Sequence, residues 1–509
     1  MKLDRSKNAL KSSFFGLLNT IITSLLQFAS RTVMIYTIGT EYLGLGNLFT
    51  SILSVLSLAE LGMSSAIVYG MYKPIAENNN KAVCSLLNFY KKAYYIIGTF
   101  ILIVGIALVP FLDKLISGSY PSDINLKLIY LIYLGDTVIS YYAGAYKKCI
   151  LAALQRNDIQ CAISIVTNIL LYGGRMLVLI FARDFYAYAI LLPVTTIINN
   201  LYTFKYTSEK YPLFFAKGKL EKSVKDELMS KISSLFFFKI GGIVNTSVDS
   251  IVISAYLGLT ILAQYNNYYY IISALITFCG MYITALLPGV GNSIVTESVE
   301  KNYRDFNEIF FLHSWIIGWC TICLINLFQP FISLWVGKSN VLDFTIVILL
   351  SVSFYIWKIQ DIVLIFKDAN GLWERDRIRV LMTAGVNLVL SVLLVNKIGL
   401  AGVIFATVIS RIAIEMPWGT YILFDSYFPK KEIWSYIKTL AIYTMITIAI
   451  GVITYNLCLL VSGDGVAAFL LKLIICGVFT NVLYLIIFSR FRISRDAFEL
   501  VKNALKKKI

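Results

Sequence analysis

Long apolar runs alternate with short polar segments along almost the whole chain. A run of about 20 apolar residues is long enough to cross the hydrocarbon core of a bilayer as a helix. The pattern therefore predicts an all-α integral membrane protein with about fourteen transmembrane helices. The predicted spans are residues 14–36, 43–69, 94–112, 126–146, 159–181, 186–204, 232–256, 263–287, 309–331, 344–366, 380–396, 403–424, 437–460 and 466–488.

Composition supports this class and excludes a soluble protein. Hydrophobic residues make up 58% of the 509 residues and charged residues only 15%, a balance that a soluble chain of this length would not carry without aggregating. The formal net charge of +16 would indicate nucleic-acid binding in a soluble chain. Here the basic residues cluster in short loops between apolar runs, where they orient a protein in the membrane.

The distribution of Lys and Arg predicts the topology. We expect a multi-pass protein with both termini in the cytoplasm, because an even number of spans returns the chain to its starting side and basic loops stay inside. The first helix would serve as the insertion signal, since the basic start runs directly into a full-length span. With this orientation the basic residues in the outer loops are Lys114, Lys127, Arg183, Lys338 and Lys397.

The longest predicted cytoplasmic loop, residues 205–231, carries seven lysines and separates the first six spans from the last eight. We therefore predict an N-lobe at 1–204, a basic cytoplasmic linker at 205–231, a C-lobe at 232–424, and two further spans with a basic cytoplasmic tail at 425–509. The alternative for the linker is a solvated basic loop that contacts anionic lipid headgroups.

A weak internal repeat with an offset of 219 residues relates the two predicted lobes. The related spans run in the same direction, so the repeat is parallel, as in one class of transporter folds. Two similar six-helix lobes facing one another would enclose a central cavity, with two C-terminal helices left over. The matching pairs are Val33 and Val252, Gly39 and Gly258, Leu43 and Leu262, and Asn47 and Asn266.

Ionisable residues inside the predicted spans are the candidate functional residues. A charge at the bilayer centre costs roughly 2.5–3.5 kcal/mol on insertion scales, so such residues face a polar cavity or a partner. The cations are Arg31, Arg175, Lys239, Lys358, Arg411, Lys438 and Lys472, and the anions are Glu60, Asp136, Asp249, Asp361 and Glu415. Lys438 and Lys472 lie close enough to span ends to reach the interface.

Local spacing offers an explanation for two pairs of these charges. Lys358 and Asp361 are three residues apart and Arg411 and Glu415 are four apart, so each pair shares a helical face and can neutralise itself. The other charges either pair between helices or serve a substrate. Excess positive charge in a water-filled cavity would favour an anionic substrate, and a guanidinium suits a phosphate or diphosphate because it donates two parallel hydrogen bonds.

Arg31 lies in the predicted outer half of the first span, and two roles are open for it. The repeat sets Ser30 against Asp249, so the predicted lobes carry opposite charges at neighbouring positions. Arg31 would either contact a diphosphate late in the crossing or form a bridge to Asp249 between the lobes that closes an outer gate.

Four sequence motifs point to a family. They are G-T-E-Y-L-G-L-G-N-L-F at 39–49, L-S-L-A-E-L-G-M-S-S-A-I-V-Y-G-M-Y at 56–72, V-D-S-I-V-I-S-A-Y-L-G-L-T-I-L-A-Q-Y-N-N-Y-Y at 248–269 and P-F-I-S-L-W-V-G at 330–337. These segments resemble Wzx-type polysaccharide flippases of the multidrug/oligosaccharidyl-lipid/polysaccharide exporter superfamily. The resemblance covers spans 1, 2, 7, 8 and 9 by motif and the remainder by hydropathy.

The resemblance implies two six-helix lobes around a cavity plus two helices, and a flippase rather than an enzyme. Such a protein moves undecaprenyl-diphosphate-linked oligosaccharide repeat units from the cytoplasmic to the outer leaflet of the bacterial plasma (inner) membrane by alternating access, for surface polysaccharide biosynthesis. Its partners would be this substrate, membrane lipids, and a polysaccharide polymerase with other assembly proteins, but no nucleic acid. No cofactor is expected, and H⁺ or Na⁺ would drive the cycle.

The family's cavities are often cationic, which fits substrate binding at Arg31, Arg175, Lys239 and Arg411. Among the buried acids, coupling or gating is expected at Asp249, Glu60, Asp136 and Asp361, and no metal site is expected. One alternative is a MATE-like ion-coupled drug/cation antiporter, although buried cations would repel cationic drugs. Another is an integral-membrane glycosyltransferase, polymerase or acyltransferase, which would need acidic residues or His in a sizeable surface loop, whereas His313 stands alone inside a span.

Overall fold

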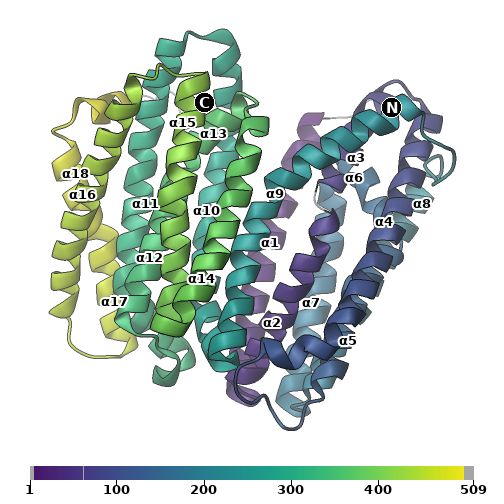
Figure 1. The fold of residues 1–509 in the computed structure, drawn as a ribbon, viewed down its shortest axis with the longest axis horizontal. Coiled ribbons are helices and arrows are strands. Elements are labelled where there is room, and N and C mark those ends of the chain that lie inside the picture. The colour runs from purple at the N-terminus through teal and green to yellow at the C-terminus, as the bar shows by residue number, and fades with distance from the viewer. Residues whose placement is uncertain (1–4, 61, 498–509) are drawn as a thin grey trace. The chain divides into compact units, whose positions relative to one another are not determined.

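A computed structural model describes residues 5–60 and 62–497, except for the side chains of residues 5–7, 9, 10, 59, 234, 235, 237–239, 241–246 and 374. Every regular element in this part of the chain is a helix (Figure 1), which confirms the predicted all-α fold. The chain forms two compact units, Met1–Ala263 and Gln264–Ile509.

In the first unit, α7 packs against both α1 and α8, α5 lies between α4 and α8, and α9 packs on α2 and α3. The side-by-side course of α4 and α5 is visible in Figure 1. The helices of this unit are α1 (Arg5–Thr37), α2 (Thr40–Leu56), η1 (Ser57–Glu60), α3 (Met63–Ala76), α4 (Asn80–Leu108), η2 (Val109–Leu115), α5 (Leu126–Tyr142), η3 (Ala145–Lys147), α6 (Lys148–Ala153), α7 (Asn157–Phe181), α8 (Phe185–Lys210) and α9 (Lys222–Leu257).

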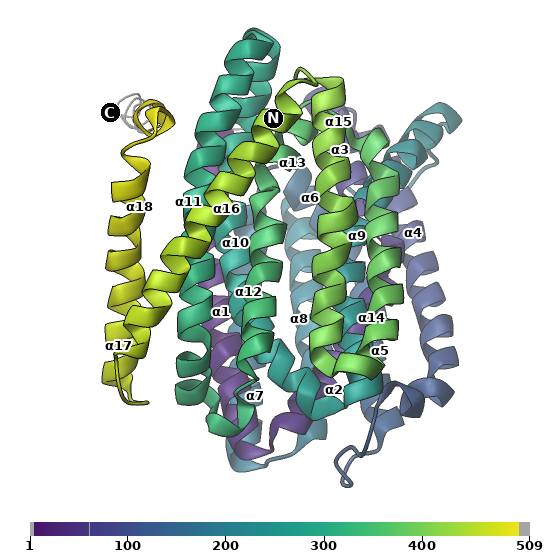
Figure 2. The same ribbon diagram turned by 60° about the vertical axis from the view of Figure 1, so that its left-hand side comes forward.

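The second unit begins within α10 and is built around α11, which packs against α12, α16 and α17. Figure 2 shows α16 and α18 beside α11. Its helices are α10 (Leu259–Thr296), α11 (Val299–Val336), η4 (Lys338–Asn340), α12 (Phe344–Ile359), α13 (Asp361–Ala369), α14 (Trp373–Ser410), the π-helix η5 (Arg411–Glu415), α15 (Met416–Ser426), α16 (Glu432–Leu459), α17 (Val466–Ile474), the π-helix η6 (Ile475–Phe479) and α18 (Thr480–Phe488).

The described residues contain ten helices that are long and apolar enough to cross a membrane, or eleven if the bent pair Leu126–Tyr142 and Ala145–Ala153 is one span. The protein is therefore a multi-pass membrane protein, but the predicted number of fourteen spans is not confirmed. One reason is that residues 375–426 count as a single helix. Two predicted spans lie within it, on either side of the non-helical residues Ile398 and Gly399.

Two matched turns support the repeat predicted from the sequence. Gly39, between α1 and α2, has φ 107° and ψ 172°, and Gly258, between α9 and α10, has φ 88° and ψ 177°. Glycine alone adopts this region readily because it has no Cβ. Gly118 and Gly337, which are separated by the same offset of 219 residues, have φ of 80° and 88°.

The basic segment 205–231 is mostly helical, because α8 continues to Lys210 and α9 begins at Lys222. The remaining connection, residues 211–221, is held against α4: Asn88 Nδ2 donates to the Gly218 carbonyl oxygen at 2.7 Å. The division into lobes at this segment stays a prediction. In the structure, α9 belongs to the first compact unit.

A buried ion network connects α13, α14 and η5 in the second unit. Lys367 is fully buried and pairs with Asp376, which is 1% exposed. Arg379 donates to both carboxylate oxygens of Asp376, at 2.5 and 2.7 Å, and lies 3.3 Å from Glu415. Glu415 lies 3.6 Å from Arg411. Each carboxylate is thus flanked by two cations, an arrangement that offsets the cost of burying the charges.

Gly44 of α2 allows close packing against the start of α10. A Cβ at this position would lie 2.2 Å from the Leu259 carbonyl oxygen. We expect Gly44→Ala to lower the thermal unfolding midpoint of the purified protein in detergent, because relieving the overlap costs roughly 1–3 kcal/mol. Gly135→Ala in α5 is the control, since nothing lies within 4 Å of its Cβ. Equal effects of the two substitutions would contradict this packing.

Asp376→Ala removes the carboxylate shared by Lys367 and Arg379. The loss of a partner from a buried ion pair costs roughly 3–5 kcal/mol, so we expect a large fall in the unfolding midpoint. Asp464→Ala is the control, because Asp464 pairs with Lys338 at 2.6 Å with both side chains largely exposed. Lys338 lowers the pKa of the Asp464 carboxyl by hydrogen bonding, yet exposed pairs contribute little to stability. A similar midpoint for both variants would count against the network.

Candidate functional site

A polar ladder joins α1 to α7 inside the first unit. Asn168 Nδ2 donates to Thr23 Oγ1 at 2.8 Å, and Gln27 Nε2 donates to Tyr172 Oη at 2.8 Å. The bonded residues advance by four positions on both helices, so the helices run parallel and successive rungs are about 6 Å apart. We call these four residues the polar ladder. Its hydrogen bonds satisfy polar side chains in two predicted spans.

The polar surface of α7 continues toward α8. Asn199 Nδ2 donates to Thr167 Oγ1 at 2.9 Å, and Thr203 Oγ1 donates to Gln160 Oε1 at 3.3 Å. Residues 160, 164, 167, 168, 172 and 175 are all polar, and spacings of three and four place them on one side of the helix. The helices α1, α7 and α8, which contain predicted spans 1, 5 and 6, therefore share a hydrophilic face. The mean hydropathy of each span does not report this face, because it averages over all sides of the helix.

Arg31 and Arg175 lie at the same level, one turn beyond the polar ladder. Its rungs join residues 145 positions apart, and this offset sets Arg31 against residue 176, next to Arg175. Arg31 is half-buried and Arg175 is buried. The packing of α1 on α7 thus brings two candidate cations, which are far apart in the sequence, to one depth.

The surroundings of Arg175 orient its guanidinium. Nε donates to the Tyr188 carbonyl oxygen at 3.3 Å, and the guanidinium lies 4.2 Å from the centre of the Tyr188 ring. Stacking on an aromatic face suits this planar cation. The half-buried Asp136 of α5 lies within electrostatic range of Arg175. Arg175 is consequently held in place mainly by an aromatic ring and a carbonyl group from α8.

Glu60 accepts a hydrogen bond where the second predicted span is interrupted. Tyr94 Oη donates to Glu60 Oε1 at 2.5 Å, and Tyr90 Oη donates to Tyr94 Oη at 2.6 Å. Glu60 ends η1, and Gly62 precedes α3 with a left-handed φ of 86°. Lys148, at the start of α6, lies within electrostatic range of Glu60. A carboxylate, a tyrosine pair and an amine therefore gather at this interruption.

In the second unit, charges also lie at a helix interruption. Lys358 and Asp361 form an ion pair across Gln360, the residue between α12 and α13. His313 Nε2 lies 2.6 Å from the Lys358 carbonyl oxygen, and His313 Nδ1 lies 2.7 Å from Tyr282 Oη. The structure confirms the pair of Lys358 and Asp361 that their spacing predicted. His313 is within hydrogen-bond distance of a backbone carbonyl group beside the break between α12 and α13.

Arg411 and Glu415 are the first and last residues of the π-helix η5 and lie 3.6 Å apart. The Arg411 guanidinium lies 4.4 Å from the Trp357 ring centre, and its Nη1 donates to the Ser353 carbonyl oxygen at 3.2 Å. Arg411 is thus part of the buried ion network. A substrate role for Arg411 and a coupling role for Asp361 stay predictions.

Two further candidates lie on α9. Asp249 is 4% exposed, whereas the side chain of Lys239 lies outside the described residues. Arg31 and Asp249 belong to the same compact unit. A bridge between them and the substrate and gating roles assigned to them stay predictions.

Sequence reasoning missed the aromatic partners Tyr188, Trp357 and Tyr94, which come from other helices and leave no local signal. It also missed the pair of Lys367 and Asp376. Lys367 lies one residue beyond the predicted span 344–366, where hydropathy predicts a loop. The spacing of Asp376 and Arg379, three residues apart, was an available signal of the kind used for Lys358 and Asp361.

The arrangement in the first unit suits an anionic, hydroxyl-rich ligand. Guanidinium groups bind phosphates, and hydroxyl and amide side chains both donate and accept hydrogen bonds. Among the described residues, no group of His, Cys, Asp and Glu could hold a metal ion.

Solved structures with this fold include flippases and transporters. The lipid II flippase MurJ in an inward closed conformation has a TM-score of 0.66 at 19% identity, covering 94% of this chain and 99% of that chain. An inward-facing multidrug resistance MATE transporter of the MOP superfamily has a TM-score of 0.60 at 13% identity, with coverages of 82% and 96%. A MOP superfamily transporter from Pyrococcus furiosus, described by the reverse polarity of its binding pocket, gives 0.52 at 14% identity, with coverages of 82% and 95%.

These identities establish similarity of fold alone. No curated protein matches the sequence significantly. The family described as "Polysaccharide biosynthesis protein" matches residues 9–292, which is more than half of the chain. The match includes the motifs at 39–49, 56–72 and 248–269 and confirms the resemblance drawn from them. The chain therefore belongs to the polysaccharide biosynthesis protein family and has the fold of the MOP superfamily of flippases and transporters.

Proposed function

We propose that the protein is a flippase that moves undecaprenyl-diphosphate-linked oligosaccharide units from the cytoplasmic to the outer leaflet of the bacterial plasma membrane. The observation that carries this proposal is the polar ladder leading to Arg31 and Arg175 at one level of the first unit. A passive membrane anchor has no need of such a face, because each polar group costs free energy in hydrocarbon. The family match supports a role in polysaccharide biosynthesis.

The two parts of the substrate fit the two parts of this surface. Oligosaccharide hydroxyls exchange hydrogen bonds with amide and hydroxyl side chains such as Gln27 and Asn168, which replace water during the crossing. The diphosphate suits the guanidinium of Arg31, with the oriented Arg175 adding positive charge at the same depth. The similar fold of the lipid II flippase MurJ supports a lipid-linked cargo.

The proposal includes the membrane orientation and the partners. Both termini lie in the cytoplasm, since basic residues concentrate in the loops on that side. The oligosaccharide repeat delivered to the outer leaflet is then joined into a longer polysaccharide, which requires a polysaccharide polymerase and other assembly proteins. The transporter works by alternating access and carries out no covalent chemistry.

The function is tested by depleting the protein in its native host. We expect lipid-linked repeat units to accumulate on the cytoplasmic side and surface polysaccharide to fall, as measured by labelling lipid-linked sugars on each side of the membrane. Normal surface display without a second flippase would contradict the proposal. A changed drug-resistance profile with normal display would favour the MATE-like antiporter instead.

Arg31→Ala, returned to the depleted cells, tests the substrate contact. We expect export to fall about tenfold or more at unchanged protein level, because a hydrogen bond to a charged group contributes roughly 1.5–3 kcal/mol. Lys114→Ala, at an exposed outer position, is the control and should export normally. Full activity of Arg31→Ala would exclude both roles for Arg31. Restored export in the paired reversal Arg31→Asp with Asp249→Arg would favour the gate.

We further propose that Glu60 couples transport to an H⁺ or Na⁺ gradient. Its carboxylate lies at a helix interruption and is reached by Tyr94 at 2.5 Å, with Tyr90 extending the chain of hydroxyl groups. Discontinuous helices commonly form the ion sites of transporters. A change in the charge of Glu60 would alter its attraction to Lys148. It would thereby change the balance of conformations at the break between η1 and α3 and at the bend between α5 and α6.

Glu60→Gln keeps the size of the side chain and removes its ability to ionise. In proteoliposomes we expect this variant to lose the acceleration that an imposed H⁺ or Na⁺ gradient gives the wild-type protein, while slow gradient-independent exchange remains. Glu41→Gln, at an exposed position at the start of α2, is the matched control. If the gradient still accelerates Glu60→Gln, coupling must occur at another acid.

A further inference from the structure

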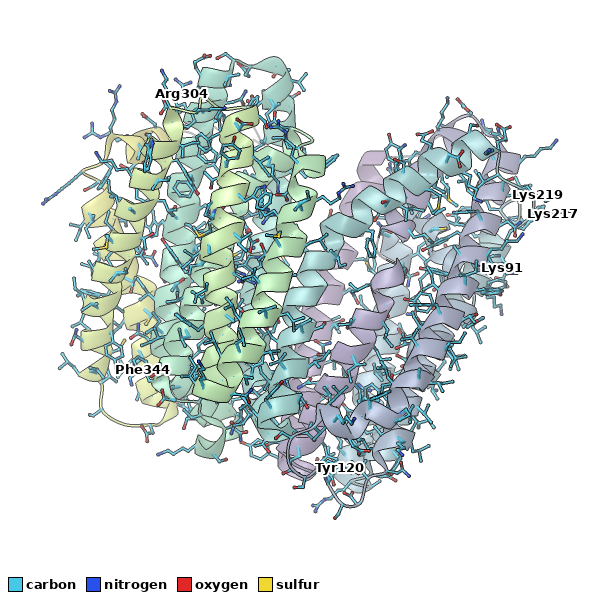
Figure 3. The ribbon with its side chains drawn as sticks, in the orientation of Figure 1. Lys91, Tyr120, Lys217, Lys219, Arg304 and Phe344 are labelled. Carbon is cyan, nitrogen blue, oxygen red and sulfur yellow. The ribbon has the colours of Figure 1, made fainter. Side chains whose placement is uncertain are left out.

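We propose that the start of α4 and the connection 211–221 form a binding site for the phosphate of an anionic phospholipid headgroup. Figure 3 shows Lys91, Lys217 and Lys219 on the same flank of the first unit. We call these three residues the lysine cluster. The site is separate from the polar ladder and does not depend on the flippase function.

One face of α4 changes from apolar to basic toward its N-terminal end. Ile96, Phe100 and Ile103 are 70%, 52% and 62% exposed, and their spacing places them on a single face. One turn before Ile96 this face carries the exposed Lys92, next to Lys91. Such a change marks the boundary between the hydrocarbon core and the headgroup region, where lysines extend toward phosphates.

The connection 211–221 is held over this boundary by specific contacts. Asn88, one turn before Lys92, donates to the Gly218 carbonyl oxygen at 2.7 Å. Gly218 has φ +96°, and a Cβ at this position would lie 2.7 Å from Ser85 Oγ. A side chain at residue 218 would therefore be strained and crowded. Glycine at this position lets the chain lie against α4. This contact places Lys217 and Lys219 near the start of α4.

The same connection exposes two large apolar side chains. Leu213 is 62% exposed and Phe215 is 51% exposed, while the Leu213 carbonyl oxygen accepts a hydrogen bond from the Cys84 thiol at 3.3 Å. Exposed apolar side chains beside lysines are typical of segments that lie in the membrane interface. This combination identifies the occupant as a lipid, because a soluble phosphate compound would gain nothing from Leu213 and Phe215.

The amines of the lysine cluster are available for a phosphate. None of the ion pairs found in the described part of the chain includes Lys91, Lys217 or Lys219. Lys91 Nζ lies 5.6 and 5.8 Å from the ring centres of Tyr95 and Tyr146. Basic residues at the membrane surface attract anionic headgroups, so three lysines on one flank would favour anionic over neutral lipids.

The test compares lipid binding by the purified full-length protein, measured by native mass spectrometry with added phosphatidylglycerol or phosphatidylcholine. We expect the combined variant Lys91→Gln, Lys217→Gln and Lys219→Gln to bind phosphatidylglycerol on the order of ten- to a hundredfold more weakly, with phosphatidylcholine binding unchanged. The control replaces three exposed lysines elsewhere by Gln and removes the same charge: Lys114, Lys127 and Lys397. Equal losses in the two variants would overturn the site and indicate a net-charge effect.

Two further variants keep every charge. Gly218→Ala displaces the connection, and the combined Leu213→Ser and Phe215→Ser change removes the apolar contacts, so both should weaken phosphatidylglycerol binding several-fold. Thermal unfolding of each variant verifies that it is folded. If the Leu213 and Phe215 changes have no effect and inorganic phosphate displaces phosphatidylglycerol, the ligand is a soluble phosphate and the lipid proposal is wrong. The export assay is independent of this binding measurement, so each proposal can fail alone.

Discussion

A polar group placed in hydrocarbon must find its partner within the protein, and this constraint governs where the charges of this chain lie. In the second unit, Lys367, Arg379 and Arg411 share the carboxylates of Asp376 and Glu415 in a buried ion network. In the first unit, Arg175 is held instead by the Tyr188 ring and carbonyl group. In an ion pair the partner carboxylate offsets the positive charge of a cation, whereas a cation stacked on an aromatic ring still attracts an anion. The first unit is therefore the better candidate for holding a diphosphate.

The same constraint explains why charges gather where helices are interrupted. A break frees backbone groups that must be satisfied inside the protein, and polar side chains nearby supply the partners. His313 lies against the carbonyl oxygen of Lys358 at one such break, and Arg411 and Glu415 bound a π-helix at another. In the first unit, Glu60 lies at the end of η1. Interrupted helices can bend at these points, so a change in charge there would be coupled to helix movement.

The basic segment between the sixth and seventh predicted spans combines two properties that had seemed to be alternatives. It connects spans, and its central part is fixed on α4 through Asn88 and Gly218. A connection anchored in this way presents its lysines at a defined depth, whereas a loose linker would not. Attraction to anionic headgroups would then contribute to orientation of the first unit in the membrane, in addition to the general effect of basic loops.

The sequence by itself determined the class of protein, the position of most helices, the family, and the local pairs Lys358–Asp361 and Arg411–Glu415. These features depend on hydropathy and on spacing within one helix, which a single sequence reports directly. The matched turns at Gly39 and Gly258 were also visible as a repeat. The structure did not confirm the predicted number of fourteen spans, because broken and kinked helices do not divide into uniform segments.

Only the tertiary structure decided which side chains meet. The common level of Arg31 and Arg175 follows from the register of α1 against α7, and the aromatic partner of Arg175 comes from α8. Tyr94 reaches Glu60 from another helix in the same way. Periodicity describes one helix at a time, whereas these contacts depend on the rotation and axial position of two helices packed together. For that reason the sequence identified the charged residues, and the packing decided which of them could act as one site.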